Sequence, residues 1–193
     1  MTTQSLPKAA AAGHLTEALR RCGALGDGRV TDVVVENSFA TVLSHIFRLR
    51  LTYEGTVADA PRSLILKAGL LDRPSGPWRA GRQEVAFYAA VAAATPAGLV
   101  PRCFEAHWDQ DTGAWHLLLE DLTDSHVVAT RWPLPPKAEQ CESIIRTRAR
   151  FQAAWWDDPR LGVTVGTWED SSATEQSRQR LAEQFVHFAA DLG

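Results

Sequence analysis

The segment SHIFRLRLTYEG (residues 44–55) alternates cleanly between apolar and polar side chains. Its apolar positions are Phe47, Leu49, Leu51 and Tyr53, and its polar positions are Arg48, Arg50 and Thr52. Because successive side chains of a strand point to opposite faces of a sheet, this pattern predicts a strand with one face in the core and one in solvent. Strands of this kind are typical of antiparallel sheets, so the segment constrains the chain to an antiparallel sheet with a solvated face.

The order of the other predicted elements defines the fold class. A helix is predicted over 8–22, where Gly23 supplies a stop, and a stronger one over 82–94, which ends near Pro96. Strands are predicted at 29–38, 44–55, 63–68, 102–109 and 114–122, with the turn QDTG between the last two. The order strand, strand, strand, helix, strand, strand predicts an α+β fold with a five-stranded antiparallel sheet and one inserted helix.

From about residue 137 the sequence becomes helical in character. We place a domain boundary in the linker RWPLPPK (131–137), where three prolines fall within four residues, so that the domains are 1–130 and 131–193. The last predicted helix carries an apolar stripe at i, i+4, i+7 and i+11, formed by Leu181, Phe185, Phe188 and Leu192. This stripe has no later segment to cover it, so we expect it to promote self-association.

The composition is that of an ordinary globular chain. Of the 193 residues, 45% are hydrophobic and 22% are charged, which excludes an intrinsically disordered chain. The net charge of −3 provides no basic field for gripping nucleic acid or an acidic membrane, so neither is expected as a partner.

The cysteines and the N-terminus indicate the cellular compartment in which the protein is expected. Cys22, Cys103 and Cys141 are odd in number, far apart and without CxxC spacing, which favours reduced thiols. The N-terminus lacks an apolar core of signal-peptide length, and no stretch approaches the ~20 apolar residues that span a bilayer. We therefore expect a cytoplasmic protein.

The segment PRSLILKAGL (61–70) places Lys67 inside an otherwise apolar strand. Alternation puts Lys67 on the same face as Ile65, while Leu64 and Leu66 take the other face. Taken alone, such a residue is explained as a lysine that guards a sheet edge.

The helix at 82–94 offers this lysine a partner. Glu84, Phe87, Tyr88 and Val91 fall at i, i+3, i+4 and i+7, so they form one stripe. If the apolar members face the sheet, Glu84 is carried inward, where a carboxylate is costly unless it is paired. A Lys67–Glu84 ion pair is therefore predicted, either as a structural pair or as the pair found in the nucleotide-binding lobe of kinases.

The stretches SLILKAG, EVAFYAAVA, VPRCFEAHWD, LLLEDL and AAWWDDPRLG follow one another in an order and spacing that resembles a known family. From about residue 30 to 165 the chain resembles small-molecule kinases of the aminoglycoside phosphotransferase and choline kinase-like group. The resemblance implies a bilobal protein-kinase-like fold, and ATP- or GTP-dependent phosphorylation of a hydroxyl of a small molecule, with Mg²⁺. Lys67 would hold the phosphates, and Glu84 would hold the lysine.

The resemblance also assigns a hinge between the lobes, at LLLEDL (117–122). Glu120 would offer its carbonyl to the nucleobase, Leu122 would offer its backbone N–H, and Leu119 would line the base pocket. Alternatively, LLLEDL is simply the end of a strand whose acidic side chains lie in solvent, and its residues have no part in nucleotide binding.

The turn that covers the phosphates would be ENSFATVLS (36–44) by the same resemblance. This segment departs from the glycine-rich pattern of kinases, since it contains no glycine. Backbone amides can still cradle phosphate there, and Ser38 or Ser44 could donate hydroxyls to it.

The catalytic residues of this family have no counterpart in the chain. They include an aspartate and an asparagine in an HGDxxxxN-like loop beyond the hinge, and a further aspartate that binds Mg²⁺. Asn37 is the one asparagine present, and it precedes Lys67; HWD (107–109) lies in a hairpin before the hinge. We therefore expect the N-terminal lobe and the first helices of a truncated C-terminal lobe, with no catalytic residue and with the Mg²⁺ ligands in a missing C-terminal part.

Two other interpretations remain open. The chain is alternatively a non-catalytic nucleotide-binding or interaction module built on a kinase-like lobe, or a small α+β scaffold in which Lys67 and Glu84 merely pair. The six histidines show no HxxxH or HExxH spacing, so no metal site is predicted.

Overall fold

The computed structural model describes residues 6–57, 60–70, 80–126, 137–165, 176 and 178–185. The chain divides into two compact units, Met1–Trp155 and Trp156–Gly193, and each is considered by itself. The predicted linker lies outside the described residues except for Lys137, and so do Phe188 and Leu192 of the predicted C-terminal stripe.

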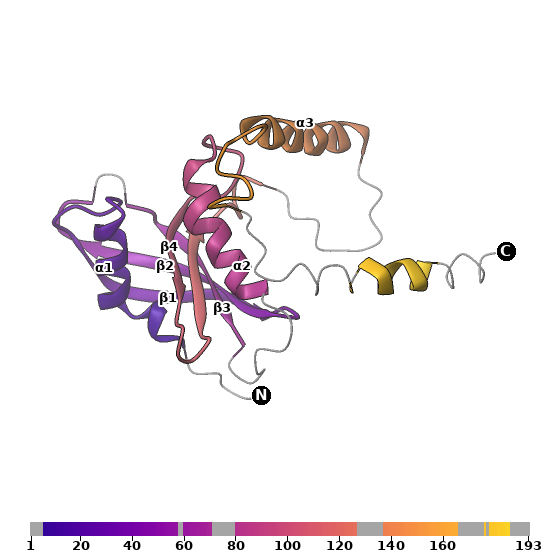
Figure 1. Ribbon diagram of the computed structural model, residues 1–193. Helices are drawn as coiled ribbons and strands as arrows, with labels where there is room; N and C mark the ends of the chain where they lie inside the picture. The colour runs from indigo at the N-terminus through magenta and orange to yellow at the C-terminus, as the bar shows by residue number, and fades with distance from the viewer. Residues whose placement is uncertain are drawn as a thin grey trace. The chain divides into compact units, whose positions relative to one another are not determined.

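The first unit is built on a five-stranded sheet whose neighbouring strands are all antiparallel (Figure 1). The strands are β1 (Arg29–Ala40), β2 (Ser44–Glu54), β3 (Ser63–Gly69), β4 (Cys103–Trp108) and β5 (Trp115–Glu120), in the spatial order β1-β2-β3-β5-β4. The predicted α+β class, the strands and the inserted helix are confirmed. Alternation along β2 is also confirmed, since Phe47, Leu49 and Leu51 are buried, while Arg50 and Thr52 are exposed.

One face of the sheet is covered by α1 (Ala12–Arg21), which follows a short 3₁₀ turn at Lys8–Ala10. The fully buried leucines of this layer come from the helix and from three strands, and they are Leu15, Leu19, Leu49, Leu64, Leu66 and Leu118. Thr16 joins the helix to the sheet, because its hydroxyl accepts a 2.9 Å hydrogen bond from the backbone N–H of Val30. The helix ends before Gly23, which adopts a φ of 71° that favours glycine.

The opposite face is partly covered by α2 (Ala80–Ala86), which continues as a π-helical turn, Phe87–Val91, and a 3₁₀ turn, Ala92–Ala94. Val85 is buried against the sheet together with Leu117 and Leu119, and Tyr88 packs on this cluster.

The predicted inward stripe of this helix is correct for Tyr88 and wrong for Phe87. The ring of Phe87 lies 6.3 Å from that of Phe151, and Val85 takes the buried position beneath the helix. The physical reason is the buried position of Val85: at about 100° per residue, Phe87 projects about 200° round the helix from Val85 and therefore away from the sheet.

Helix α3 (Ala138–Ala154) is the last element of the first unit. At its start the side chain of Gln140 accepts a hydrogen bond from the Lys137 N–H at 2.9 Å. At its end the Trp155 indole donates to the Thr95 hydroxyl at 2.9 Å, which fixes the helix terminus to the end of the α2 segment.

In the second unit, residues 178–185 are helical, as predicted for this region. Leu181 and Phe185 are 66% and 68% exposed, so the described half of the predicted apolar stripe faces solvent. Self-association through it stays a prediction.

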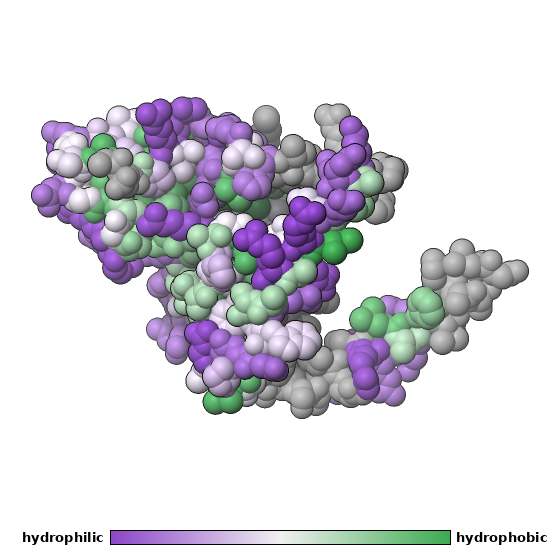
Figure 2. Space-filling view, turned by 90° about the horizontal axis from the view of Figure 1, so that it is seen from above, coloured by the Kyte–Doolittle hydropathy of each residue, from purple (hydrophilic) through white to green (hydrophobic). Residues whose placement is uncertain are grey.

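The surface mixes hydrophilic and hydrophobic residues, as the face shown in Figure 2 illustrates. Within the described ranges, no helix combines the length and apolar character needed to cross a membrane. None of Cys22, Cys103 and Cys141 forms a disulfide, and burial raises the pKa of the Cys103 thiol to about 11, which makes it unreactive.

Candidate functional site

The candidate site begins at Lys67, on the face of the sheet that α2 covers in part. Lys67 pairs across the sheet with Ile46 of β2 and with Leu117 of β5. Since directly opposed residues project to the same face, these side chains and Ile65, two residues before Lys67, share one surface. The predicted division of β3 is confirmed: Leu64 and Leu66 are fully buried on the other face.

The predicted Lys67–Glu84 ion pair is confirmed. The Lys67 ammonium donates to both carboxylate oxygens of Glu84, at 2.6 and 2.7 Å. The two side chains retain 24% and 29% of their exposure, so the pair is neither sealed in the core nor free in solvent. A cation held in this way can still reach an anionic ligand from the open side.

The Trp115 ring lies close to the ammonium of this ion pair. Its ring centroid lies 5.9 Å from the Lys67 ammonium, within the range of a cation–π contact. Gly69 and Gly81 lie against the same indole, since a Cβ at Gly69 would come within 2.5 Å of its nitrogen, and one at Gly81 would also collide with the ring. The close approach of α2 to the sheet, which brings Glu84 to Lys67, therefore depends on these glycines.

We expect Gly81→Ala to lower the free energy of unfolding by about 1–3 kcal/mol, because the added methyl group must displace either α2 or the Trp115 ring. Chemical denaturation of the purified variant measures this change. Gly13→Ala is the matched control: Gly13 lies in α1 with open space around it, so the same substitution should be neutral or stabilise by up to about 1 kcal/mol. Equal effects of the two substitutions would show that α2 does not depend on this contact.

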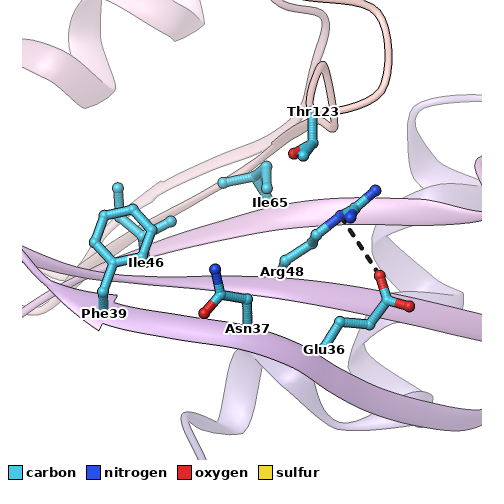
Figure 3. Close-up of a pocket in the computed structure, with 7 residues that line it drawn as sticks. All are labelled: Glu36, Asn37, Phe39, Ile46, Arg48, Ile65 and Thr123. Carbon is cyan, nitrogen blue, oxygen red and sulfur yellow. Dashed lines mark ion pairs between the residues drawn. The ribbon is translucent and has the colours of Figure 1, made fainter. Parts of the chain in front are cut away.

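A pocket of about 270 Å³ lies on the face of the sheet that carries Lys67 (Figure 3), since its lining includes Ile46, the cross-strand partner of Lys67. Its lining residues come from β1, β2, β3 and the segment after β5, and they are Glu36, Asn37, Phe39, Ile46, Arg48, Ile65 and Thr123. Ile46 and Ile65 form an apolar surface, and Asn37, Arg48 and Thr123 add hydrogen-bonding groups. An apolar surface with a few polar groups is the usual make-up of a small-ligand site.

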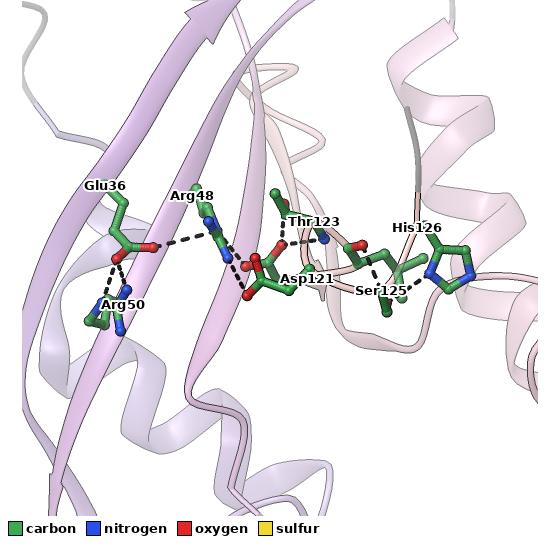
Figure 4. Close-up of polar contacts among 9 residues, drawn as sticks. Glu36, Arg48, Arg50, Asp121, Thr123, Ser125 and His126 are labelled. Atoms are coloured by element: carbon green, nitrogen blue, oxygen red, sulfur yellow. Dashed lines mark hydrogen bonds and ion pairs between the residues drawn. The ribbon is translucent and has the colours of Figure 1, made fainter. Parts of the chain in front are cut away.

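A chain of polar contacts joins this pocket to the segment that follows β5 (Figure 4). Arg48 donates to Asp121 at 2.6 Å and to Asp124 at 3.0 Å, and it lies 3.5 Å from Glu36. Glu36 also pairs with Arg50. The Arg48 guanidinium therefore connects the middle of β2 to residues 121–124.

Asp121 is the most buried member of this series of polar contacts and holds it in place. Its side chain is only 2% exposed, and it accepts hydrogen bonds from the Thr123 backbone N–H at 3.0 Å and from the Thr123 hydroxyl at 2.5 Å. Burial acts to raise the pKa of Asp121, but hydrogen bonds from Thr123, Arg48 and Ser63 outweigh it and lower the pKa to about 2. Asp121 is thus ionised at neutral pH and fixes the direction in which the chain leaves β5.

Sequence reasoning missed Asp121, although two signals for it were present. An aspartate two residues before a threonine is a common start of a turn in which the carboxylate accepts backbone N–H bonds. Arg48 was predicted on the solvated face of β2, and a cation there needs an anionic neighbour once a loop folds over it.

The predicted hinge residues lie beside this anchor. Glu120 ends β5 opposite Leu64, and its carboxylate accepts from the Arg102 N–H at 3.1 Å. The Leu122 carbonyl accepts hydrogen bonds from the N–H groups of Ser125 and His126, which form a tight turn. Leu119 does not line the pocket; it is 8% exposed in the cluster beneath α2, since its alternation places it under Val85.

Neither of the two serines predicted for phosphate binding places an exposed hydroxyl on the face of Lys67, and their role in phosphate binding stays a prediction. Ser38 pairs with Phe47, so it lies on the face of the sheet opposite Lys67. Ser44 shares the face of Lys67 but is completely buried, and its hydroxyl is 2.8 Å from that of Thr41. The turn at 41–43 is a tight hairpin closed by Thr41, whose backbone N–H donates to the Ser44 carbonyl at 2.7 Å.

Taken together, the site offers an ammonium restrained by a carboxylate, an apolar surface with polar edges beside it, and a rigid turn at its rim. Comparisons with protein-family models, with curated proteins and with solved structures found no match for this chain. Its function is therefore inferred from this geometry and from the sequence resemblance.

Proposed function

We propose that this chain binds a purine nucleotide in the pocket, with the phosphates at Lys67, and that it is the nucleotide-binding part of an ATP- or GTP-dependent phosphotransferase. The acceptor would be a hydroxyl of a small molecule. The observation that carries the proposal is the Lys67–Glu84 pair beside the pocket, on the same face of the sheet.

The chemistry of the pair supports this role. A lysine whose ammonium is held by a carboxylate is oriented before a ligand arrives, and a charge-assisted hydrogen bond to phosphate is stronger than a neutral one. In protein kinases the same combination, a lysine on the third strand and a glutamate on the following helix, positions the phosphates of ATP. Here Lys67 lies on β3, and Glu84 lies on α2, the next helix along the chain.

The position of the pocket supports binding of a base. Ile65 precedes Lys67 by two residues on the same face, and Ile46 lies directly across from Lys67 on β2. A flat heterocycle seated on these side chains would meet Asn37 at one edge and Thr123 at the other.

The order of elements supports a kinase-like lobe. The five strands form one antiparallel sheet, and α2 is inserted in the chain between the third and fourth of them. The chain leaves β5 through the turn that Asp121 holds. By the resemblance this exit is the hinge to a second lobe, where the catalytic aspartate and asparagine, as well as the Mg²⁺ ligands, would be found.

A second candidate is a nucleotide-binding module without catalysis. It is supported by Asn37, which lies on β1 at the pocket, where its amide can hydrogen-bond a nucleobase without any catalytic group. Both candidates require the same pocket and the same lysine, so the first experiment tests nucleotide binding itself.

We expect ATP with Mg²⁺ to bind the wild-type chain, and Lys67→Ala to raise the Kd about 10–100-fold, because a hydrogen bond to a charged group contributes about 1.5–3 kcal/mol. Isothermal titration calorimetry measures both values. Glu84→Gln should also weaken binding, since the ammonium is no longer held by a charged partner.

Lys8→Ala is the matched control, because Lys8 is an exposed lysine in the 3₁₀ turn that precedes α1 and is not part of the pocket. Its Kd should equal that of the wild type. Indistinguishable binding by the wild type and Lys67→Ala would leave Lys67 a structural residue and reject both candidates. ATP consumption with small hydroxyl acceptors, measured on the same samples, separates the phosphotransferase from the non-catalytic module.

A further inference from the structure

A group of metal-ligating side chains lies on the face of the sheet opposite the nucleotide pocket. His14 comes from α1, Glu105 from β4 and His116 from β5. The Glu105 Oε2 atom lies 2.6 Å from the His14 Nε2 atom and 2.8 Å from the His116 Nε2 atom. The three potential ligand atoms all lie within 4.8 Å of one another.

The sequence hides this group because its members are not regularly spaced. His14 and Glu105 are 91 positions apart, and Glu105 and His116 are 11 apart. The antiparallel pairing of β4 and β5 brings the last two together, and the packing of α1 on the sheet adds the first. The prediction that no metal site is present rested on histidine spacing alone, which cannot detect such a set.

The surroundings suit a cation that enters from solvent. The Glu105 side chain is 8% exposed and that of His116 is 14% exposed, whereas His14 is 32% exposed and leaves an entry path at the edge of α1. Arg21 donates to the other carboxylate oxygen, Oε1, at 2.9 Å. It thereby orients the carboxylate and leaves Oε2 directed at both imidazoles, in the manner of an outer-shell partner at a metal centre.

We propose that His14, Glu105 and His116 form a binding site for a divalent transition-metal ion of the zinc type. Two imidazole nitrogens and one carboxylate oxygen are a donor set that zinc uses with water in the fourth position. Zinc bonds of about 2.0–2.2 Å place the donor atoms of a tetrahedral site about 3.4 Å apart. The two hydrogen-bonded contacts of 2.6 and 2.8 Å thus need to open by less than about 1 Å, which requires small rotations of the His14 and His116 side chains.

A bound ion would fasten α1 to β4 and β5. The site shares no residue with the nucleotide pocket, so the inference is independent of the proposed function. Because the three ligands come together only in the folded chain, the ion stabilises that state: at a free concentration of about 100 times the Kd it lowers the unfolding equilibrium constant about 100-fold.

The test is a zinc titration of the full chain after treatment with a chelator, with competition against a chromophoric chelator as the readout. We expect one zinc ion per chain. His14→Ala and His116→Ala should each raise the Kd by at least about 10-fold, since loss of even an outer-shell partner typically costs 10–100-fold. His107→Ala is the matched control: its ring stacks on His116 at 5.0 Å, but it is not one of the three ligands, and the Kd should stay within about 3-fold of the wild type.

The cobalt(II) form provides a second readout that does not depend on affinity. Its visible spectrum should show ligation by nitrogen and oxygen without a thiolate charge-transfer band, and His14→Ala should change it while circular dichroism shows an intact fold. Three results would overturn the proposal: no stoichiometric zinc binding, zinc affinity unchanged in both ligand variants, or a thiolate band that assigns the ion to cysteine. The first of these would leave the cluster a hydrogen-bonded link between α1 and the sheet.

Discussion

Replacing Asp121 by alanine should lower the free energy of unfolding by about 3 kcal/mol, because removal of one partner of a buried ion pair costs about 3–5 kcal/mol. The lower end applies here since Arg48 keeps contact with solvent and with Glu36. The substitution also removes the acceptor for both hydrogen bonds from Thr123, so the turn after β5 loses its anchor. Guanidinium denaturation at neutral pH measures the change.

Asp124→Ala is the matched control for this prediction. Asp124 contacts the same guanidinium, at 3.0 Å, but its side chain is 86% exposed, and exposed ion pairs contribute little. We expect unfolding of this variant to coincide with that of the wild type. If Asp121→Ala were as mild as Asp124→Ala, the Arg48–Asp121 contact would not hold the turn.

The second large effect concerns acid. Glu105 has a pKa of about 2 in the folded chain, compared with an ordinary value of 4.5. Because the folded-state pKa is depressed, its contribution to stability is fully present above about pH 5 and is lost as the pH falls toward 2. A shift of this size corresponds to about 3 kcal/mol, at 1.36 kcal/mol per pKa unit.

The measurement is the free energy of unfolding between pH 2 and 7 in the presence of a chelator, for the wild type and Glu105→Gln. The groups that contact Glu105 are His14, His116 and Arg21, so the variant removes the anion that all three share. Between pH 2 and 4.5 the free energy of unfolding of the wild type should rise more steeply with pH than that of Glu105→Gln. The difference in slope should correspond to the uptake of up to one proton on unfolding. Glu17→Gln, an exposed glutamate on α1, should follow the wild-type profile, and equal slopes for all three proteins would contradict the prediction.

Several parts of the structure could be predicted because they depend on neighbours along the chain. Alternation over 44–55 is the local signature of a strand with one buried face, and β2 has that burial pattern. Gly23 and Gly113 have φ values of 71° and 68°, which explains why a glycine marks the end of α1 and the hairpin before β5. The Lys67–Glu84 pair could also be predicted. Strand alternation placed Lys67 on one face of β3, helical spacing placed Glu84 on the inward face of its helix, and a buried charge needs a partner.

Other parts depend on register and packing, which no local pattern contains. Ser44 has the same residue type and strand position that would suit a ligand-binding hydroxyl, but the hairpin closed by Thr41 buries it. Phe87 points away from the sheet because Val85, two positions earlier, takes the buried place beneath the helix, although the spacing from Glu84 predicts Phe87 inward. In each case the outcome is set by how the elements pack rather than by the residue type.

Local patterns were sufficient to predict the α+β class, the five strands, the inserted helix and the lysine–glutamate pair, because hydrophobic periodicity and the cost of an unpaired buried charge act within short segments. The contact of Asp121 with Arg48, 73 positions away, and that of His14 with Glu105, 91 positions away, became visible in the folded chain alone. Such contacts are set by which strands pair, where a bulge shifts their register between Cys103 and Glu105, and how a helix lies on the sheet. These are properties of the whole packed layer, so the residues that share a site become neighbours only after the chain has folded.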